Sequence, residues 1–189
     1  MLIARFRLVL VKRLLRLLVD TERLTGRNMV SIMDEALELE VGHKVLEVGG
    51  GSGWHAATIA EVVAPSDVPK EKWGHVYTVE RLAQLAAFAK NNIEKAGYGD
   101  RITVIHQDGT LGYTEQAPYD RIMVAAAGPQ VPQPLVDQLK DGGTLVVPVG
   151  GAQFYQTLIR IRKKGNKVVQ ENLGGVSFVP LIGKHGFEQ

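Results

Sequence analysis

The sequence predicts an α/β protein built on a doubly wound, mostly parallel sheet with an antiparallel hairpin near its C-terminus. Three observations predict this fold. From residue 29 onward, short apolar runs alternate with segments whose apolar residues recur at helical spacing. The apolar run 45–48 passes directly into a turn made almost entirely of glycine. Near the end, two apolar runs flank Lys164-Gly165-Asn166, a sequence typical of a hairpin turn.

The first half of the chain supplies three strands and three helices of this fold. The strands are short and mostly apolar, as expected for parallel strands covered on both faces. They are expected at residues 44–49, 74–80 and 102–108. The helices are expected at residues 29–39, 54–64 and 81–97. Gly42 follows the first helix and Gly97 ends the third, which agrees with the preference for glycine at helix C-termini.

The second half continues the alternation and then changes to antiparallel strands. A fourth strand is expected at 119–127 and a fifth at 144–150, with a helix over 132–143 between them. Two prolines near the start of that helix and a glycine pair at its end support its boundaries. Residues 154–173 are expected to form the hairpin, and residues 175–183 a last extended segment.

Residues 1–22 form a separate unit in this interpretation, a basic amphipathic helix that precedes a single domain at 23–189. Five cations are spread along the leucine-rich start of the chain, and each costs roughly 2.5–3.5 kcal/mol near a bilayer centre, so a membrane span is excluded. We expect this helix to pack against the domain or a partner subunit, as in a homo-oligomer, rather than to lie on an anionic membrane.

The composition limits the partners. The formal net charge of +2 is too small to indicate a nucleic-acid partner. The chain has no cysteine, so disulfides and thiolate metal sites are excluded and a cytoplasmic location is expected. Its five histidines are scattered without the spacing of metal ligands, and we therefore expect no metal site.

The glycine turn predicts a site for a nucleoside-like ligand, because free amides and a helix N-terminus face whatever binds there. Gly49, Gly51 and Gly53 are present, but Trp54 stands where the third glycine of a dinucleotide-binding fingerprint belongs. A P-loop is excluded because no Gly-Lys-Ser/Thr follows. A glycine-rich turn taken alone remains compatible with a purely structural role.

Three acidic residues at successive strand ends narrow the choice of ligand. Glu47 precedes the turn and suits an ammonium or sulfonium group better than a phosphate. Glu80 ends the second strand, where a carboxylate can accept hydrogen bonds from ribose hydroxyls. Asp108, followed by Gly109, can accept from an adenine amino group. Taken singly, Glu80 and Asp108 are also compatible with helix caps or solvated charges. Together these positions favour S-adenosylmethionine.

The cofactor-binding residues predicted in this way belong to the three strand ends and the turns that follow them. They are Glu47, Gly49, Gly50, Gly51, Ser52, Gly53, Glu80, Arg81, Asp108 and Gly109.

At the run 107–150 the sequence resembles the protein-L-isoaspartate (D-aspartate) O-methyltransferase family. The matching pieces are Asp108-Gly109, Gly112-Tyr113, Ala117-Pro118-Tyr119-Asp120, Ala125-Ala126-Ala127, Pro132, Pro134, Gln138-Leu139-Lys140, Gly142-Gly143 and Pro148-Val149-Gly150. Phe178-Val179-Pro180-Leu181 also resembles the end of the family's sequence, and the resemblance covers roughly residues 24–187.

The resemblance implies a class I methyltransferase fold with S-adenosylmethionine as methyl donor. It also implies a function, methylation of the α-carboxylate of isoaspartyl residues in damaged proteins, which allows their repair. The partners implied are isoaspartyl-containing proteins and peptides.

The resemblance further implies residues that contact the substrate. Thr25 takes the position of the family's serine hydroxyl and is the catalytic candidate; it also suits a helix N-cap, a role that does not exclude a function in the site. Arg27 and Asn28 replace the family's usual Pro-His and are weaker substrate-binding candidates. Val176, Ser177 and Phe178 are candidates for backbone contact with an extended peptide, and an ordinary edge strand explains them equally well.

Two alternatives stay open at this point. Because residues 25–28 and the short N-terminus depart from the family pattern, the chain could be a related class I methyltransferase with a different acceptor. It could also be a non-catalytic member of the fold that binds a partner or a membrane through its basic helix. A nicotinamide dehydrogenase is disfavoured by Glu47 and Trp54.

Overall fold

The computed structural model describes residues 27–153 and 155–188. The predicted N-terminal helix at 1–22 and Thr25 therefore lie outside the described residues. Among the described residues no helix is long and apolar enough to cross a membrane.

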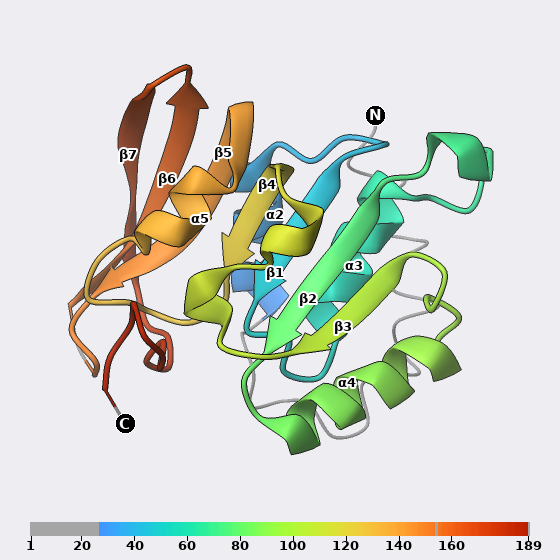
Figure 1. The fold of residues 1–189 in the computed structure, drawn as a ribbon, viewed down its shortest axis with the longest axis horizontal. Helices are drawn as coiled ribbons and strands as arrows, with labels where there is room; N and C mark the ends of the chain where they lie inside the picture. The colour runs from blue at the N-terminus through green and yellow to red at the C-terminus, as the bar shows by residue number, and fades with distance from the viewer. Residues whose placement is uncertain (1–26, 154, 189) are drawn as a thin grey trace.

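Within the described ranges one sheet of seven strands forms the centre of the molecule (Figure 1). The strands are β1 (Lys44–Val48), β2 (His75–Glu80), β3 (Ile102–His106), β4 (Tyr119–Val124), β5 (Leu139–Gly150), β6 (Gln156–Lys164) and β7 (Lys167–Val176). They lie in the order β3-β2-β1-β4-β5-β6-β7. Strands β1 to β5 pair in parallel, whereas β5–β6 and β6–β7 pair antiparallel. The predicted mixed sheet and its hairpin are confirmed.

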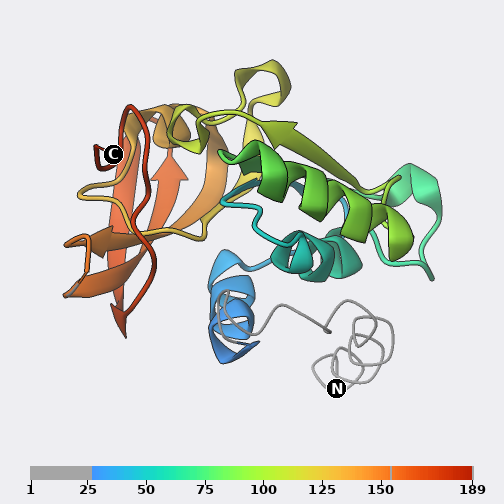
Figure 2. The same cartoon turned by 90° about the horizontal axis from the view of Figure 1, so that it is seen from below.

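Helices cover both faces of this sheet. They are α2 (Arg27–Leu37), α3 (Trp54–Val63), α4 (Ala83–Lys95) and the short α5 (Gln133–Asp137). Three-residue 3₁₀ turns occur at Lys70–Lys72, Gly109–Leu111 and Thr114–Gln116. Figure 2 shows α2, α3 and α4 on one face, whereas α5 lies on the other. The doubly wound arrangement that the sequence predicts is therefore present.

Two buried clusters of apolar side chains hold these layers together. One lies under α2 and α3 and includes Met33, Ile59 and Met123, none of which is exposed. The other lies on the α5 side and includes Leu135 and Tyr119, also fully buried. The central strands are therefore buried on both faces, which is the physical origin of their mostly apolar sequences.

The predicted helix at 132–143 is wrong in its second half. Helix α5 ends at Asp137, and strand β5 already begins at Leu139. Leu139 is buried in parallel register with Tyr119, and the Lys163 ammonium donates to the Leu139 carbonyl oxygen at 2.7 Å. These contacts with residues distant in the chain end the helix before the glycine pair is reached.

The fourth strand and the last extended segment are also shorter than predicted. Strand β4 ends at Val124, after which the Ala125 amide donates to the Val48 carbonyl oxygen at 2.8 Å. Beyond β7, Pro180 forms an isolated bridge with Ala127 rather than a strand. The C-terminal segment thus crosses the carboxyl end of β4.

Candidate functional site

The glycine turn lies where the order of the strands reverses. Strand β1 is flanked by β2 on one side and by β4 on the other, so the chain moves outward in one direction through β2 and β3 and then in the opposite direction from β4. The turn 49–53 leaves the carboxyl end of β1 at this reversal. Sheets of this kind bind their ligands in the crevice beyond these strand ends.

The backbone of the turn requires glycine at several positions. Gly49, Gly51 and Gly53 have φ values of 95°, 51° and 82°, in the left-handed region that side chains disfavour. A Cβ atom added to Gly50 would lie 2.6 Å from the Thr78 hydroxyl. The turn is therefore narrow because of both its conformation and its close approach to β2.

Glu80 joins the end of β2 to this turn. Its Oε2 accepts a hydrogen bond from the Gly51 amide at 3.0 Å, and its Oε1 accepts from the Leu82 amide at 2.9 Å. The side chain is only 7% exposed. Because a carboxylate has about four lone-pair sites, these two bonds leave acceptor capacity for a ligand.

Asp108 and Gly109 lie at the same edge of the sheet. A Cβ atom on Gly109 would lie 2.5 Å from Val48 Cγ1, so this glycine packs directly on the end of β1. The Asp108 carboxylate accepts from the Thr110 amide at 2.9 Å and from the Lys184 amide at 2.8 Å. Burial opposes ionisation of Asp108, but these hydrogen bonds prevail and its pKa is lowered.

Glu47 is fully buried in β1, and neither of its carboxylate oxygens has a hydrogen-bond partner among the described residues. Burial raises the pKa of Glu47 to about 7, and nearby His55 acts against this rise. The Thr78 hydroxyl, in register with Glu47 on β2, is also buried and acts with His55 to limit this rise in pKa. A buried, unpaired carboxylate is costly and points to a further donor or cation in this part of the site.

The remaining cofactor candidates lie beside the turn. Ser52 is 6% exposed; its hydroxyl lies 3.4 Å from the Trp54 amide. Asn92 of α4 donates to the Ser52 carbonyl oxygen at 3.0 Å, and this bond connects the glycine turn to α4. Arg81 is half-buried directly after β2, and the His106 ring nitrogen lies 3.1 Å from its carbonyl oxygen. All ten predicted cofactor residues therefore lie at or directly after the carboxyl ends of β1, β2 and β3.

The substrate candidates are only partly described. Arg27 and Asn28 are the first two residues of α2, directly after the segment that contains Thr25. Val176 ends β7, and Ser177 is exposed. The Phe178 amide donates to Gln156 Oε1 at 2.6 Å and its carbonyl oxygen accepts from Gln156 Nε2 at 3.0 Å. A peptide that bonded the backbone of Phe178 would have to replace these bonds.

Sequence reasoning missed two features of the site. The C-terminal segment folds back onto Asp108, where Gly183 leaves room for the carboxylate because a Cβ atom there would lie 2.2 Å from Oδ1. A buried pair, Asp34 and His55, joins α2 to α3 with a distance of 2.9 Å between Oδ1 and Nε2. No local signal in the sequence marks this pair, because each helix carries several other polar residues.

Comparison with known proteins identifies the family. A model described as protein-L-isoaspartate(D-aspartate) O-methyltransferase matches residues 18–186. The chain is 50% identical over 168 residues to the protein-L-isoaspartate O-methyltransferase of Hyperthermus butylicus, covering 89% of this chain and 70% of that one. It is 49% identical over 169 residues to the enzyme of the same name from Korarchaeum cryptofilum, covering 89% of this chain and 76% of that one.

Solved structures agree with the sequence matches. A protein-L-isoaspartate O-methyltransferase superposes with a TM-score of 0.75 at 30% identity, covering 86% of this chain and 49% of that one. A Plasmodium falciparum protein described as a protein-L-isoaspartate O-methyltransferase, solved with S-adenosyl-L-homocysteine, gives a TM-score of 0.67 at 27% identity and covers 81% of this chain and 71% of that one. Because the family model spans most of the sequence and relatives of the same name are about half identical, the chain belongs to the protein-L-isoaspartate (D-aspartate) O-methyltransferase family.

Proposed function

We propose that this protein transfers a methyl group from S-adenosylmethionine to the α-carboxylate of isoaspartyl residues in damaged proteins. The observation that carries the proposal is the meeting of Glu47, the glycine turn, Glu80 and Asp108 at one edge of the sheet, in a chain of this family. Each group suits a different part of the cofactor, and no phosphate site is required.

The residues present fit this cofactor. Glu47 offers a buried carboxylate without a partner in the described residues, which suits a positively charged group. Glu80 keeps acceptor capacity beyond its bonds to Gly51 and Leu82, which suits ribose hydroxyls. Asp108 is ionised at neutral pH, because its pKa is lowered, and it can accept from an adenine amino group.

The chemistry asks little of the protein beyond positioning. When bound, S-adenosylmethionine supplies an activated methyl group on a sulfonium with a good leaving group. The acceptor carboxylate is already a nucleophile, so no general base is required. The protein must exclude water and hold the carboxylate oxygen in line with the methyl carbon and the sulfur. We assign the orienting donor to the Thr25 hydroxyl, with Arg27 and Asn28 beside it, and peptide contact to Val176, Ser177 and Phe178.

A paired-peptide assay tests this function. The protein should methylate a peptide that contains an isoaspartyl residue and leave its normal aspartyl twin unlabelled, and the product should be a base-labile ester. Equal labelling of both peptides would reject isoaspartyl recognition. Binding of S-adenosylmethionine without methylation of either peptide would instead favour a different acceptor, the alternative suggested by Thr25-Gly26-Arg27-Asn28.

The proposal extends to the setting in which the enzyme works. Its substrates are isoaspartyl-containing proteins and peptides. The absence of cysteine supports a cytoplasmic location, where thiols and not disulfides prevail. Association into a homo-oligomer through residues 1–22 stays a prediction, and sedimentation of the full chain beside a chain that starts at residue 23 would test it.

A further inference from the structure

Strand β7 forms a free edge of the central sheet among the described residues. It lies last in the strand order and pairs only with β6, and Figure 1 shows it at the outer margin of the sheet. Val168 and Val169 of this strand are 51% and 53% exposed, on opposite faces of the sheet. A free edge presents unpaired backbone donors and acceptors to any strand that approaches it. Strand β7 is therefore a candidate docking surface.

The geometry of the hairpin determines which backbone groups of β7 face this edge. Lys164 and Lys167 flank the two-residue turn between β6 and β7 and are paired directly across it. Residues that flank a two-residue turn exchange backbone hydrogen bonds, and bonded and non-bonded pairs then alternate along an antiparallel ladder. The backbone groups of Val169 therefore face β6, whereas those of Val168 and Gln170 face the free edge.

Lys167 lies on this edge without an oppositely charged partner in the described part of the chain. It stands directly opposite Lys164 of β6, and neither ammonium group forms an ion pair with a described residue. Like charges placed opposite each other on neighbouring strands are unfavourable. Lys167 therefore suits a further strand that brings a carboxylate to its other side.

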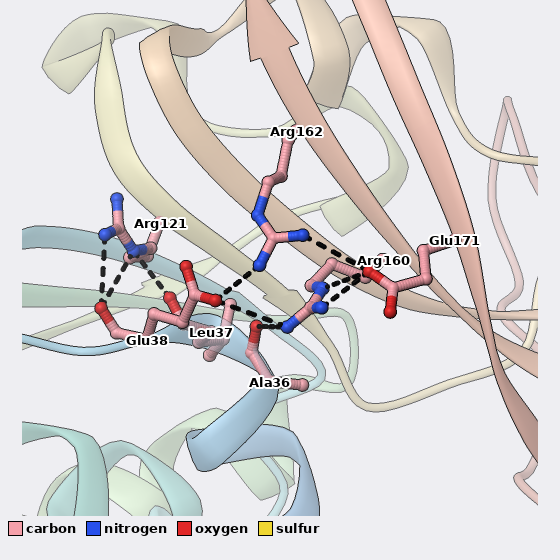
Figure 3. Close-up of polar contacts among 7 residues, drawn as sticks. All are labelled: Ala36, Leu37, Glu38, Arg121, Arg160, Arg162 and Glu171. Carbon is pink, nitrogen blue, oxygen red and sulfur yellow. Dashed lines mark hydrogen bonds and ion pairs between the residues drawn. The ribbon is translucent and has the colours of Figure 1, made fainter.

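Glu171 presents such a carboxylate on the same face of β7, four residues beyond Lys167 (171 − 167). Arg160 Nε and Arg162 Nη1 of β6 donate to its Oε2 at 3.0 and 3.2 Å, whereas neither arginine donates to Oε1 (Figure 3). These bonds hold the Glu171 side chain in place, so it loses little conformational freedom when it meets another cation. One edge of the sheet therefore carries both a lysine that lacks a carboxylate and a carboxylate with an oxygen to offer.

We propose that β7 pairs with β7 of a second copy of this chain, antiparallel and centred on Val169. In this register the two Val169 side chains meet at the twofold axis, and Lys167 of each copy lies opposite Glu171 of the other. Val168 and Gln170, whose backbone groups face the edge, lie opposite each other and exchange hydrogen bonds between the copies. Backbone hydrogen bonding and charge therefore favour the same register.

Neighbouring registers lack this match. Centring the pair on Gln170 places Val169 opposite Glu171 and Lys167 opposite Leu173, and centring it on Glu171 brings two carboxylates together. The opposite charges of β7 thus match a second copy of the same strand, which is the property of a self-complementary interface. Pairing over residues 167–171 buries little surface, so we expect a weak dimer that depends on protein concentration.

Sedimentation of the full chain over a range of concentrations tests the pairing and does not depend on methyl transfer. The unmodified protein should shift from monomer towards dimer, with a Kd below about 1 mM. Val168→Pro removes an amide that faces the edge and none that bonds β6, so this variant should stay monomeric. Val168→Thr keeps the amide and the branched side chain and should still dimerise. A protein that stays monomeric up to about 1 mM, or a dimer that survives Val168→Pro, as one held by residues 1–22 would, overturns the inference.

A pair of charge reversals tests the contact between Lys167 and Glu171. Lys167→Glu places like charges opposite each other twice across the twofold axis and should raise the Kd of the dimer about tenfold. Lys164→Glu makes the same change of net charge on β6, one strand away from the edge, and should leave the Kd within about twofold. Equal effects of the two reversals would show that net charge alone, and not this contact, governs association.

Cross-linking tests the register, because the chain contains no cysteine. Directly opposed residues at a non-hydrogen-bonded position have Cα atoms about 4.5 Å apart, within the range that a disulfide spans. Val169→Cys should therefore oxidise to a covalent dimer at least about tenfold faster than Lys164→Cys, whose thiol is exposed on β6. Equal rates for these two variants would overturn the pairing, and faster cross-linking of Gln170→Cys than of Val169→Cys would overturn its register.

Discussion

The Asp108 carboxylate accepts a hydrogen bond from the backbone amide of Lys184 at 2.8 Å, across 76 residues of sequence. The same carboxylate accepts from the Thr110 amide and hydroxyl, at 2.9 and 2.7 Å. One acidic residue therefore shapes the turn after β3 and fastens the C-terminal segment to the edge where the cofactor is proposed to bind. Asp108 therefore has a structural role in addition to the binding role that we propose for it.

Replacing Asp108 should weaken cofactor binding. In Asp108→Ala the proposed bond to the adenine amino group is lost, and hydrogen bonds to charged groups contribute about 1.5–3 kcal/mol. The Kd for S-adenosylmethionine, measured by calorimetric titration, should therefore rise roughly 10- to 100-fold. Asp67→Ala, at an exposed position in the loop after α3, is the control. Unchanged affinity in Asp108→Ala would remove this residue from the cofactor site.

Glu47 should make the stability of the cofactor-free protein depend on pH. Its pKa is raised from 4.5 to about 7, so between these values the unfolded chain has lost the proton that the folded chain keeps. The contribution of Glu47 is therefore fully present below pH 4.5 and is lost as the pH rises through 7, a fall of roughly 3 kcal/mol.

The variant Glu47→Gln isolates this effect, because glutamine does not titrate. Urea unfolding at pH 5 and pH 8 should show a steeper loss of stability in the unmodified protein than in Glu47→Gln. Glu94→Gln, on the exposed side of α4, should behave like the unmodified protein. Parallel pH profiles for the unmodified protein and Glu47→Gln would contradict the raised pKa.

Substitutions at Gly53 and Gly97 test whether the glycine turn needs space as well as a left-handed backbone. Their φ values are 82° and 80°, so an alanine at either position should cost about 1–2 kcal/mol of left-handed strain. Only at Gly53 is space also short, since an added Cβ would lie 3.0 Å from the Ile93 side chain and 3.2 Å from the Ala89 carbonyl oxygen, whereas Gly97 has open space.

We therefore expect Gly53→Ala to lose more stability in urea than Gly97→Ala, and only Gly53→Ala to bind S-adenosylmethionine more weakly. Unfolding and ligand titration on the two proteins measure both effects. Identical losses would mean that crowding by Ile93 and Ala89 has no part in shaping the turn.

Thr25 should affect turnover rather than cofactor binding. Thr25→Val removes the hydroxyl that is proposed to orient the substrate carboxylate, while keeping the size of the side chain. Loss of one hydrogen bond to a charged group corresponds to about a 10- to 100-fold lower kcat/KM for the isoaspartyl peptide. Thr25→Ser keeps the hydroxyl and should retain most of the activity. An unchanged rate in Thr25→Val would exclude this residue from the site.

The sequence by itself determined the repeating strand–helix order, the C-terminal hairpin and the position of the glycine turn. These follow from signals confined to a few neighbouring residues, namely apolar periodicity and the conformations open to glycine. Glu47, Glu80 and Asp108 could also be predicted to lie close together. Each follows or ends a strand that the sequence marks, and parallel strands bring their carboxyl ends to a common edge of the sheet.

Only the tertiary structure decided where α5 gives way to β5, how the C-terminal segment reaches Asp108, and which residues join α2 to α3. Leu139, predicted to be helical, pairs with Tyr119 in the sheet. The Lys184 amide donates to Asp108, 76 residues earlier in the chain. Asp34 contacts His55, which lies 21 residues later in the sequence. Contacts between distant segments carry no periodic signal, because each partner is chosen by its surroundings in the folded chain and not by its neighbours in sequence.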